Sequence, residues 1–147
     1  MEDRILETFL ELVRIDSETY HESAMADFVM EAARGSGFES YMDNAGKAIG
    51  GEAGNVYIRM PENGVDAPPI IFCSHMDTVS PGKGVEPMVK AGRVLSAGET
   101  ILGADCKAGV AAILEIIRLS AEGRLRHGPI EIILTVEEET QLQGVRN

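Results

Sequence analysis

The sequence has little cysteine, few basic residues and no long apolar run, and each shortage excludes a class of protein. Two cysteines, Cys73 and Cys106, cannot make a disulfide framework, so we expect a reducing compartment and a cytoplasmic protein. The sequence has only 13 basic side chains against 24 acidic ones, and the resulting net charge of -11 would repel a nucleic-acid phosphate backbone. No apolar run reaches membrane-spanning length, and the acidic N-terminal segment has helical apolar spacing instead of a signal-peptide core. We therefore expect neither nucleic acid nor a membrane as a partner.

The chain is long enough for one compact domain. Its 147 residues are 44% hydrophobic, which allows a sizeable core but is too short for two full domains. Apolar residues at helical spacing predict a first helix over residues 5–13, and KAGVAAILEIIRLS predicts a deeply buried helix over residues 107–120. Between them, TYHE predicts a helix start in which Thr19 and Glu22 form a capping box, with the helix ending at residues 35–37.

Apolar segments predict the strands of a sheet. NVYIRM at residues 55–60, PIIFCS at residues 69–74 and PIEIILTV at residues 129–136 are typical of strands, the last two of them buried. PMVKAGRVLSAG predicts a β-hairpin with its turn near Ala91 and Gly92. The later chain alternates strand, helix and strand. This order predicts a three-layer α/β/α domain with a mostly parallel, mixed sheet and helices on both faces.

Ionisable residues lie where these elements begin or end. His75 and Asp77 follow one buried strand, Asp105 precedes the long helix, and the acidic run 137–139 follows the last strand. Taken alone, each group has an ordinary explanation. His75 could be a hydrogen-bonded histidine at a strand end, Asp105 a helix N-cap, and the run 137–139 a solvated acidic stretch at a helix start. The carboxyl ends of strands in an open α/β sheet line one crevice, so these groups are expected to converge. Carboxylates and an imidazole in one crevice need a cation, and divalent metals bind this mixture of oxygen and nitrogen.

Three motifs carry a family resemblance. SHMDTVSPGKGVEP, ILGADCKAGVAAILE and LTVEEETQLQG, in this order and spacing, resemble the zinc metallopeptidases related to peptidase T. The larger group also holds carboxypeptidases and acyl-amino-acid deacylases, and GEAGNVYIRMP is more similar to the peptidase T-like branch. The similarity runs from the first predicted helix to the end of the chain. It implies a phosphorylase/hydrolase-like fold.

The resemblance implies a role for each ionisable residue. His75 would bind one zinc ion, Asp105 would bridge two ions, and Glu139 would bind the second. Glu138 would be the catalytic general base and acid, taking a proton from water and giving it to the leaving amine. Asp77 would support catalysis by accepting the other ring N–H of His75 and fixing its tautomer. A bridging carboxylate holds two cations about 3.5–4 Å apart, where they activate a shared water.

The resemblance also implies local features of the backbone. A cis peptide bond is expected between Asp105 and Cys106. Relatives usually carry glycine two positions after the metal-binding glutamate, where this chain has Gln141, so the following turn is expected to differ. Cys106 stands where relatives often have another residue type, and a small buried thiol is favoured over a metal ligand as its interpretation.

The family uses further metal ligands that these residues do not supply. Its site also takes a carboxylate from shortly beyond the double glutamate and a histidine from near the far C-terminus, with a lid domain inserted between them. Eight residues follow Glu139, since 147 − 139 = 8. At about 3.3 Å per strand residue, His127 is expected ~30 Å away at the opposite edge of the sheet, and His21 lies at a helix start. We expect residues 1–147 to be the N-terminal portion of a catalytic domain, without its lid and C-terminal portion.

Three hypotheses about function remain open. The favoured one is a dinuclear zinc aminopeptidase that releases N-terminal residues from short peptides. A deacylase or amidohydrolase of the same group is one alternative, and a non-catalytic, truncated binding module is the other. Because each ion would have only two protein ligands, the chain alone is expected to bind zinc weakly and to be inactive. It is also expected to form a homo-oligomer through an open, apolar side of its sheet.

Overall fold

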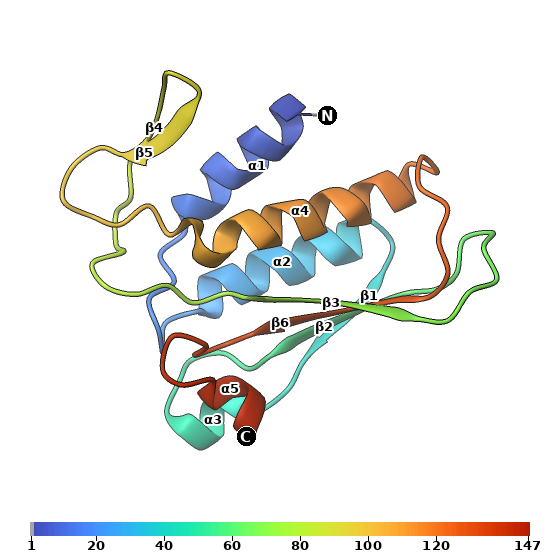
Figure 1. Cartoon of the computed structure of the whole chain (residues 1–147). Helices are drawn as coiled ribbons and strands as arrows, with labels where there is room; N and C mark the ends of the chain where they lie inside the picture. The colour runs from blue at the N-terminus through green and yellow to red at the C-terminus, as the bar shows by residue number, and fades with distance from the viewer. Residues whose placement is uncertain (1) are drawn as a thin grey trace.

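The computed structural model describes residues 2–147, with side chains from residue 4 onward. Its centre is a four-stranded sheet with the strand order β1-β2-β6-β3 (Figure 1). The strands of this sheet are β1 (Glu39–Met42), β2 (Val56–Met60), β3 (Ile70–His75) and β6 (Ile130–Thr135). A separate antiparallel hairpin consists of β4 (Pro87–Lys90) and β5 (Arg93–Ser96). The helices are α1 (Glu2–Val13), α2 (Ser23–Gly35), α3 (Ala45–Ile49), α4 (Ala104–Ala121) and α5 (Gln143–Arg146).

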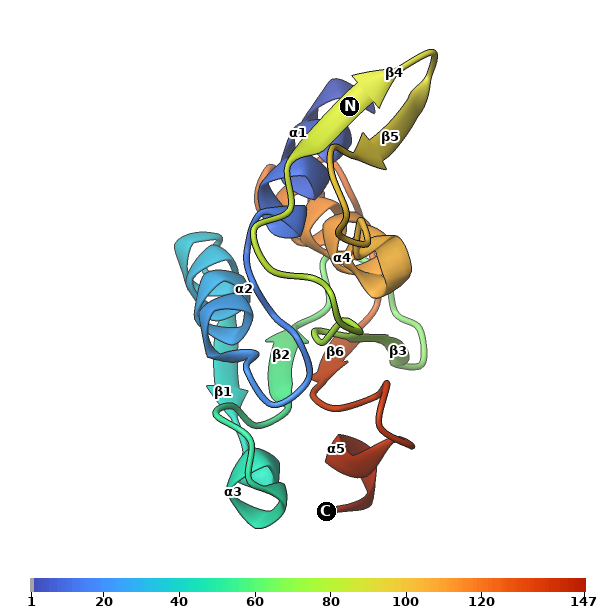
Figure 2. The same cartoon turned by 90° about the vertical axis from the view of Figure 1, so that its left-hand side faces the viewer.

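Three helices lie on one side of the sheet and enclose the core. Figures 1 and 2 show α1, α2 and α4 on this side, with α3 and α5 at the end where β3 and β6 finish. Side chains alternate along β2 and β6, so Val56, Ile58, Ile132 and Leu134 point into the core and are at most 2% exposed. Leu114 of α4 belongs to the same buried cluster. Burying each such side chain is worth about 1.5–3 kcal/mol, so β2 and β6 are firmly held.

The sheet is mixed, and its one parallel pair carries the site. Helix α4 connects β3 to β6, and these two strands pair in parallel as the strand–helix–strand pattern predicts. In contrast, β1 pairs antiparallel with β2, and β2 antiparallel with β6. The α/β class and the mixed sheet are therefore confirmed, but the described sheet is not mostly parallel. Strand β1 is not predicted by the sequence because Glu39, Tyr41 and Met42 are all exposed and leave no apolar alternation.

The other face of the sheet is open. Tyr41, Tyr57 and Ile133 share one row across it, because these residues are register partners. The rings of Tyr41 and Tyr57 stack with their centroids 4.8 Å apart, and Tyr41 is 62% exposed. An ion pair between Arg59 and Glu131 occupies the neighbouring row. Within residues 2–147, helices thus cover one face of the sheet rather than both, and the open face is partly apolar and partly charged.

The predicted hairpin is present as β4 and β5. Ala91 and Gly92 form its turn, with φ angles of 50° and 72°. Two positive φ angles in succession are typical of the type I′ turn that joins two-residue hairpins. The hairpin projects away from the four-stranded sheet on the side that carries the helices (Figure 1).

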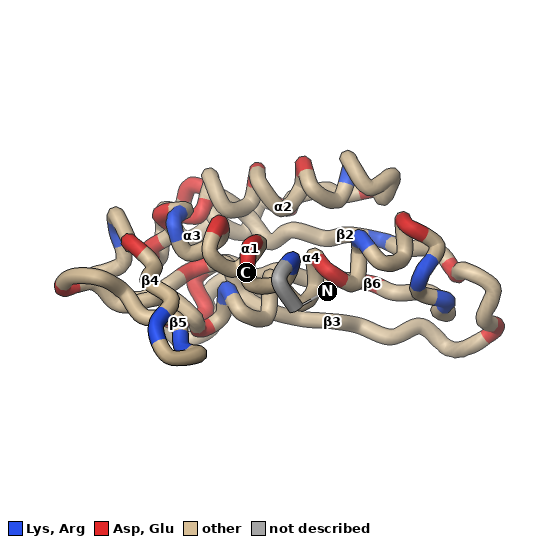
Figure 3. The backbone as a smooth tube through the Cα atoms, turned by 90° about the horizontal axis from the view of Figure 1, so that it is seen from above, with Lys and Arg blue, Asp and Glu red and all other residues tan. Residues whose placement is uncertain are grey.

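Charge is distributed unevenly over the molecule. Figure 3 shows many acidic residues along the helices and loops, and fewer basic residues, which are scattered over the molecule and include some on the β4–β5 hairpin and before the start of β6. The formal net charge is -11.

None of the helices in residues 2–147 is both long enough and apolar enough to span a membrane.

Candidate metal centre

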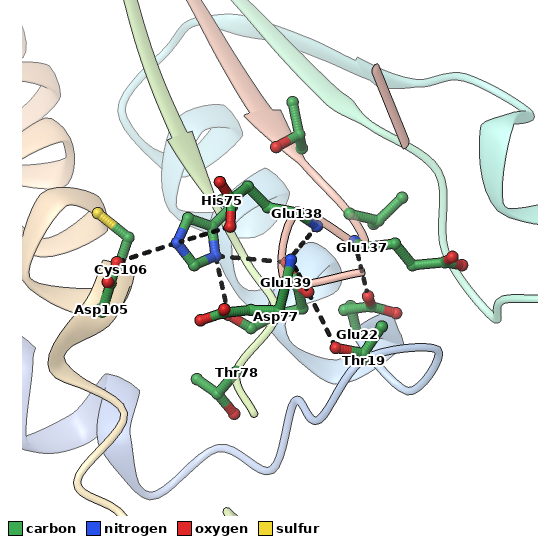
Figure 4. Close-up of polar contacts among 12 residues, drawn as sticks. Thr19, Glu22, His75, Asp77, Thr78, Asp105, Cys106, Glu137, Glu138 and Glu139 are labelled. Carbon is green, nitrogen blue, oxygen red and sulfur yellow. Dashed lines mark hydrogen bonds and ion pairs between the residues drawn. The ribbon is translucent and has the colours of Figure 1, made fainter. Parts of the chain in front are cut away.

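The predicted site residues meet where β3 and β6 end and α4 begins (Figure 4). Strand β3 ends at His75, whose register partner on β6 is Thr135. Because parallel neighbours finish at the same edge of a sheet, the run 137–139 emerges beside His75. Asp105 reaches the same place from the first turn of α4. Three segments that are far apart in the sequence therefore converge.

His75 is the buried centre of this cluster, with 7% of its surface exposed. Its Nδ1 atom lies 2.9 Å from the backbone oxygen of Asp77 and 3.3 Å from Oδ1 of the same residue. Its Nε2 atom lies 3.1 Å from Oδ1 of Asp105 and 4.0 Å from Oε2 of Glu138. Burial lowers the pKa of His75, but hydrogen bonds with Asp77 and Asp105 outweigh burial and raise this pKa to about 9. Asp77 thus holds one ring nitrogen, and the other faces the site carboxylates.

Asp77 is completely buried and accepts several hydrogen bonds. The Thr19 hydroxyl donates to Oδ2 over 3.0 Å. The backbone N–H groups of Glu138 and Glu139 donate to Oδ1 and Oδ2 over 3.0 and 3.1 Å. Burial raises the pKa of Asp77, but hydrogen bonds from His75 and from these donors more than compensate, so its pKa lies below the ordinary value. Asp77 therefore fixes both the imidazole and the backbone that carries the two glutamates.

The predicted capping box does not form. Helix α2 begins at Ser23, and the side chain of its N-cap residue Glu22 makes no capping hydrogen bond. The Thr19 hydroxyl binds Asp77 instead, and Oε1 of Glu22 accepts the backbone N–H of Glu137 over 3.1 Å. The chain before α2 runs along the end of β3, since Thr19 N–H donates to the backbone oxygen of Thr78. This tertiary contact places both side chains in the site, which a local spacing pattern does not reveal.

The peptide bond between Asp105 and Cys106 is cis, as the resemblance implies. Both residues have non-helical backbone angles within the first turn of α4. The Asp105 side chain is 86% exposed and reaches His75. Cys106 is half-buried rather than buried, and its Sγ joins His75 and Asp105 in one group of candidate ligands. Gly109 makes room for this thiol, because a Cβ atom there would lie 2.8 Å from Sγ.

Glu138 and Glu139 complete a second group of candidate ligands. Ligand atoms of His75, Glu138 and Glu139 all lie within 4.8 Å of one another. Burial raises the pKa of Glu139, as do the nearby carboxylates, against the opposing charge of His75. Acids this close repel one another unless a cation lies between them. The structure thus brings together His75, Asp105, Glu138 and Glu139, and the division of roles among them stays a prediction.

Two buried glutamates of this region are not predicted by the sequence. Glu22 and Glu137 are both 0% exposed. Among the described residues, Oε2 of Glu22 and both side-chain oxygens of Glu137 have no hydrogen-bond partner. Burial is the main cause that raises the pKa of both carboxyl groups, and the pKa of Glu22 rises to about 7. In the sequence, Glu22 resembles a capping residue and Glu137 one member of an acidic run, so neither pattern indicates burial.

The other two histidines lie elsewhere. His127 precedes β6, where its Nε2 is 2.6 Å from the Ser120 hydroxyl and its Nδ1 is 2.7 Å from the Gly128 oxygen. Nδ1 of His21 is 2.8 Å from Oε1 of Glu52, and this pair is exposed. In residues 2–147, neither histidine belongs to a group of candidate metal ligands.

The fold and this cluster together define the class of protein. The chain matches Peptidase family M20/M25/M40 over residues 71–147, more than half its length, and it belongs to that family. It is therefore a member of a group of metallopeptidase-like hydrolases.

Individual relatives narrow this class. The aminopeptidase PepT of Bacillus cereus is 40% identical, with a TM-score of 0.94, and the match covers 99% of this chain and 39% of that one. A tripeptidase of Staphylococcus aureus is 42% identical, with the same TM-score and the same coverage of 99% and 39%. The YqjE protein of Bacillus subtilis is 44% identical over 145 residues, which are 99% of this chain and 39% of that protein. The resemblance to peptidase T-like enzymes is confirmed, and the chain spans about two-fifths of these relatives.

Proposed function

We propose that these residues belong to a dinuclear zinc aminopeptidase that releases N-terminal residues from short peptides. The observation that carries the proposal is the convergence of His75, Asp105, Glu138 and Glu139 at one edge of the sheet. The backbone that holds them is similar to an aminopeptidase and to a tripeptidase, each with a TM-score of 0.94. These neighbours favour a peptide over an N-acyl amino acid as the substrate.

The side chains present fit divalent metal ions. They offer an imidazole nitrogen and carboxylate oxygens, which are ligands that zinc accepts. We assign His75 to one ion, Glu139 to the other, and Asp105 to both as the bridge. Each ion then has two protein ligands, whereas catalytic zinc usually has three. We therefore propose that further ligands come from outside residues 1–147.

The residues of the site divide the chemistry between them. Zinc, when bound, supplies an activated water and polarises the peptide carbonyl. Glu138 accepts the proton of the attacking water and delivers it to the leaving amine. Asp77 holds Nδ1 of His75, so Nε2 is the nitrogen available to metal. Asp77 also binds the N–H groups of Glu138 and Glu139, which couples the placement of all three ionisable side chains.

We propose a cytoplasmic, self-associating protein. Cys73 and Cys106 are free, and the exposed thiol of Cys73 suits a reducing compartment. Exposed apolar side chains such as Tyr41 and Ile71 lie on the open face of the sheet, and a surface of this kind favours association. Light scattering during size-exclusion chromatography of residues 1–147 tests the oligomeric state.

Hydrolysis of matched peptides tests the proposed function. With zinc, the complete gene product is expected to release the N-terminal residue from a tripeptide and to act far more slowly on its N-acetylated form. A chelator should abolish the activity, and added zinc should restore it. Faster cleavage of N-acyl amino acids would favour a deacylase instead. Zinc binding without hydrolysis of either substrate would favour a binding module.

A further inference from the structure

Two buried carboxylates hold three consecutive backbone N–H groups of the run 137–139 (Figure 4). The N–H of Glu137 donates to Oε1 of Glu22 over 3.1 Å. The N–H groups of Glu138 and Glu139 donate to the two oxygens of Asp77 over 3.0 and 3.1 Å. Hydrogen bonds to successive amides fix the peptide planes between them. Glu22 and Asp77 therefore set the directions in which Glu138 and Glu139 leave the backbone.

The run 137–139 needs this support because it departs from strand geometry. Adjacent side chains of a strand point to opposite faces, yet Glu138 and Glu139 both bring ligand atoms within 4.8 Å of His75. The backbone turns at Glu137, whose φ of 52° lies in the left-handed region that non-glycine residues rarely adopt. The N–H of Glu137 is buried at this turn and requires an acceptor.

A buried glutamate at position 22 is energetically unfavourable for folding. Its carboxyl group is buried, and Oε2 has no partner among the described residues. Burying a polar group without full hydrogen bonding destabilises a fold. An apolar side chain of similar volume would avoid this cost of burying a carboxyl group. Glu22 does not cap α2, and its hydrogen bond to Glu137 joins positions 115 residues apart. An apolar residue would not reproduce that bond, which is the contact of Glu22 with the run 137–139.

We propose that Glu22 is a positioning residue, whose Oε1 acceptor fixes the backbone at Glu137 and thereby places Glu138 and Glu139 beside His75. This inference rests on the proposed function, in which Glu138 moves protons and Glu139 binds metal. Asp77 cannot replace Glu22, because its two oxygens already accept the next two amides. Without Glu22 the first amide loses its acceptor, and the peptide plane before Glu138 is free to rotate.

Two substitutions of Glu22 in the complete gene product separate positioning from packing. Glu22→Met fills a similar volume without an acceptor, whereas Glu22→Gln keeps a carbonyl oxygen of the same reach. We expect Glu22→Met to remain folded, while zinc affinity and kcat fall about 10- to 100-fold, as for residues that orient metal ligands. KM should change little, and hydrogen exchange of the amides 137–139 should accelerate in the metal-free protein. Glu22→Gln should stay close to wild type in zinc affinity, kcat and exchange of these amides.

Glu52→Ala is the matched control, because Glu52 contacts the same helix start through His21 and Ser23 but not the run 137–139. It should leave zinc affinity, kcat and amide exchange unchanged. Wild-type exchange and zinc affinity in Glu22→Met would overturn the proposal, as would equal losses in Glu22→Gln. A Glu22→Met protein that does not fold would also overturn it, since the role would then be structural. If the wild-type protein lacks zinc-dependent peptidase activity, the proposed function fails, and amide exchange still decides the role of Glu22.

Discussion

Glu138 and Glu139 are adjacent in sequence, yet their surroundings differ. Oε2 of Glu138 lies 4.0 Å from Nε2 of His75, and its N–H is held by one oxygen of Asp77. Glu139 is held by the other oxygen, and it also lines a hollow with residues of the segment before α2, including Thr19 and Tyr20. Both glutamates have oxygens within reach of a shared metal ion. Either glutamate is therefore within reach of a metal ion, and substitution of each one separates proton transfer from metal binding.

Removing these acids one at a time separates their roles. Glu138→Ala is expected to lower kcat by at least about 100-fold, because it removes the group that transfers the proton, while zinc content stays nearly unchanged. Asp105→Ala should lose both activity and zinc, because one carboxylate is proposed to hold both ions. Metal analysis beside peptidase assays on Glu138→Ala, Asp105→Ala and Glu139→Ala checks this. If Glu138→Ala stripped the metal and Glu139→Ala did not, the assigned roles would be reversed.

Gln141 occupies a backbone conformation that favours glycine. Its φ is 67°, in the left-handed region, where a side chain costs roughly 1–2 kcal/mol. Glycine avoids this cost but loses more chain entropy on folding. Gln141→Gly is therefore expected to raise the free energy of unfolding by about 0.5–1 kcal/mol, measured by urea denaturation. Gln141→Ala is the control, since it shortens the side chain but keeps the Cβ atom. An equal gain in both variants would refute the backbone explanation.

Among the elements, those with strong apolar patterns are the ones that the sequence predicts. β6 and α4 have such patterns because they are buried in the core. The predicted burial of β3 is wrong, because β3 is an edge strand whose Ile70 and Ile71 are 51% and 61% exposed. The convergence of His75 and Asp105 still follows from where β3 ends and α4 begins. β1 and the short helices α3 and α5 have no comparable signal. Polar contacts between distant segments fix them, and such contacts leave no periodicity in the sequence. Glu22 escapes prediction for the same reason, since its partner Glu137 is 115 positions away.

Asn55 is the polar residue that joins several of these elements. Its Nδ2 atom donates to Oδ2 of Asp43 before α3 over 2.9 Å and to the oxygen of Gly144 in α5 over 2.8 Å. Its Oδ1 atom accepts the N–H of Val136 after β6 over 3.1 Å. The residue is 4% exposed. One buried amide side chain thus connects the segment before α3, the end of β6 and the last helix.

Asn55→Ala should therefore lower the free energy of unfolding by more than the loss of a single hydrogen bond does. It leaves the buried Val136 N–H and the Gly144 oxygen without their partner, and each such group costs about 1–3 kcal/mol. We expect the free energy of unfolding to fall by at least about 2 kcal/mol, with faster hydrogen exchange in α5. Asn63→Ala is the matched control, because the Asn63 side chain makes a single hydrogen bond, to the Leu125 oxygen, among the described residues. Equal losses in the two variants would contradict the connecting role of Asn55.

At the scale of the whole molecule, the site brings several carboxyl groups together in a chain that already carries a large negative net charge. Glu22 faces Asp77 and Glu137, and burial together with the charge of Asp77 raises its pKa to about 7 from an ordinary value near 4.5. The folded protein therefore binds this proton more tightly than the unfolded chain does. The stabilisation is complete below the unfolded pKa and is lost as pH rises from about 4.5 to about 7. Above that range the folded state bears the full cost of a buried carboxylate.

The free energy of unfolding should show this dependence when wild type is compared with Glu22→Gln. Glutamine does not titrate, so subtracting its curve cancels the other ionisable groups that the two proteins share. The difference, wild type minus variant, is expected to fall by on the order of 3 kcal/mol between about pH 5 and about pH 8, since each pKa unit corresponds to about 1.4 kcal/mol. Urea denaturation at several pH values across this range, in metal-free protein, measures it. A difference that stays flat would mean that Glu22 has an ordinary pKa, and one that rises with pH would mean that Glu22 is stabilised as the anion.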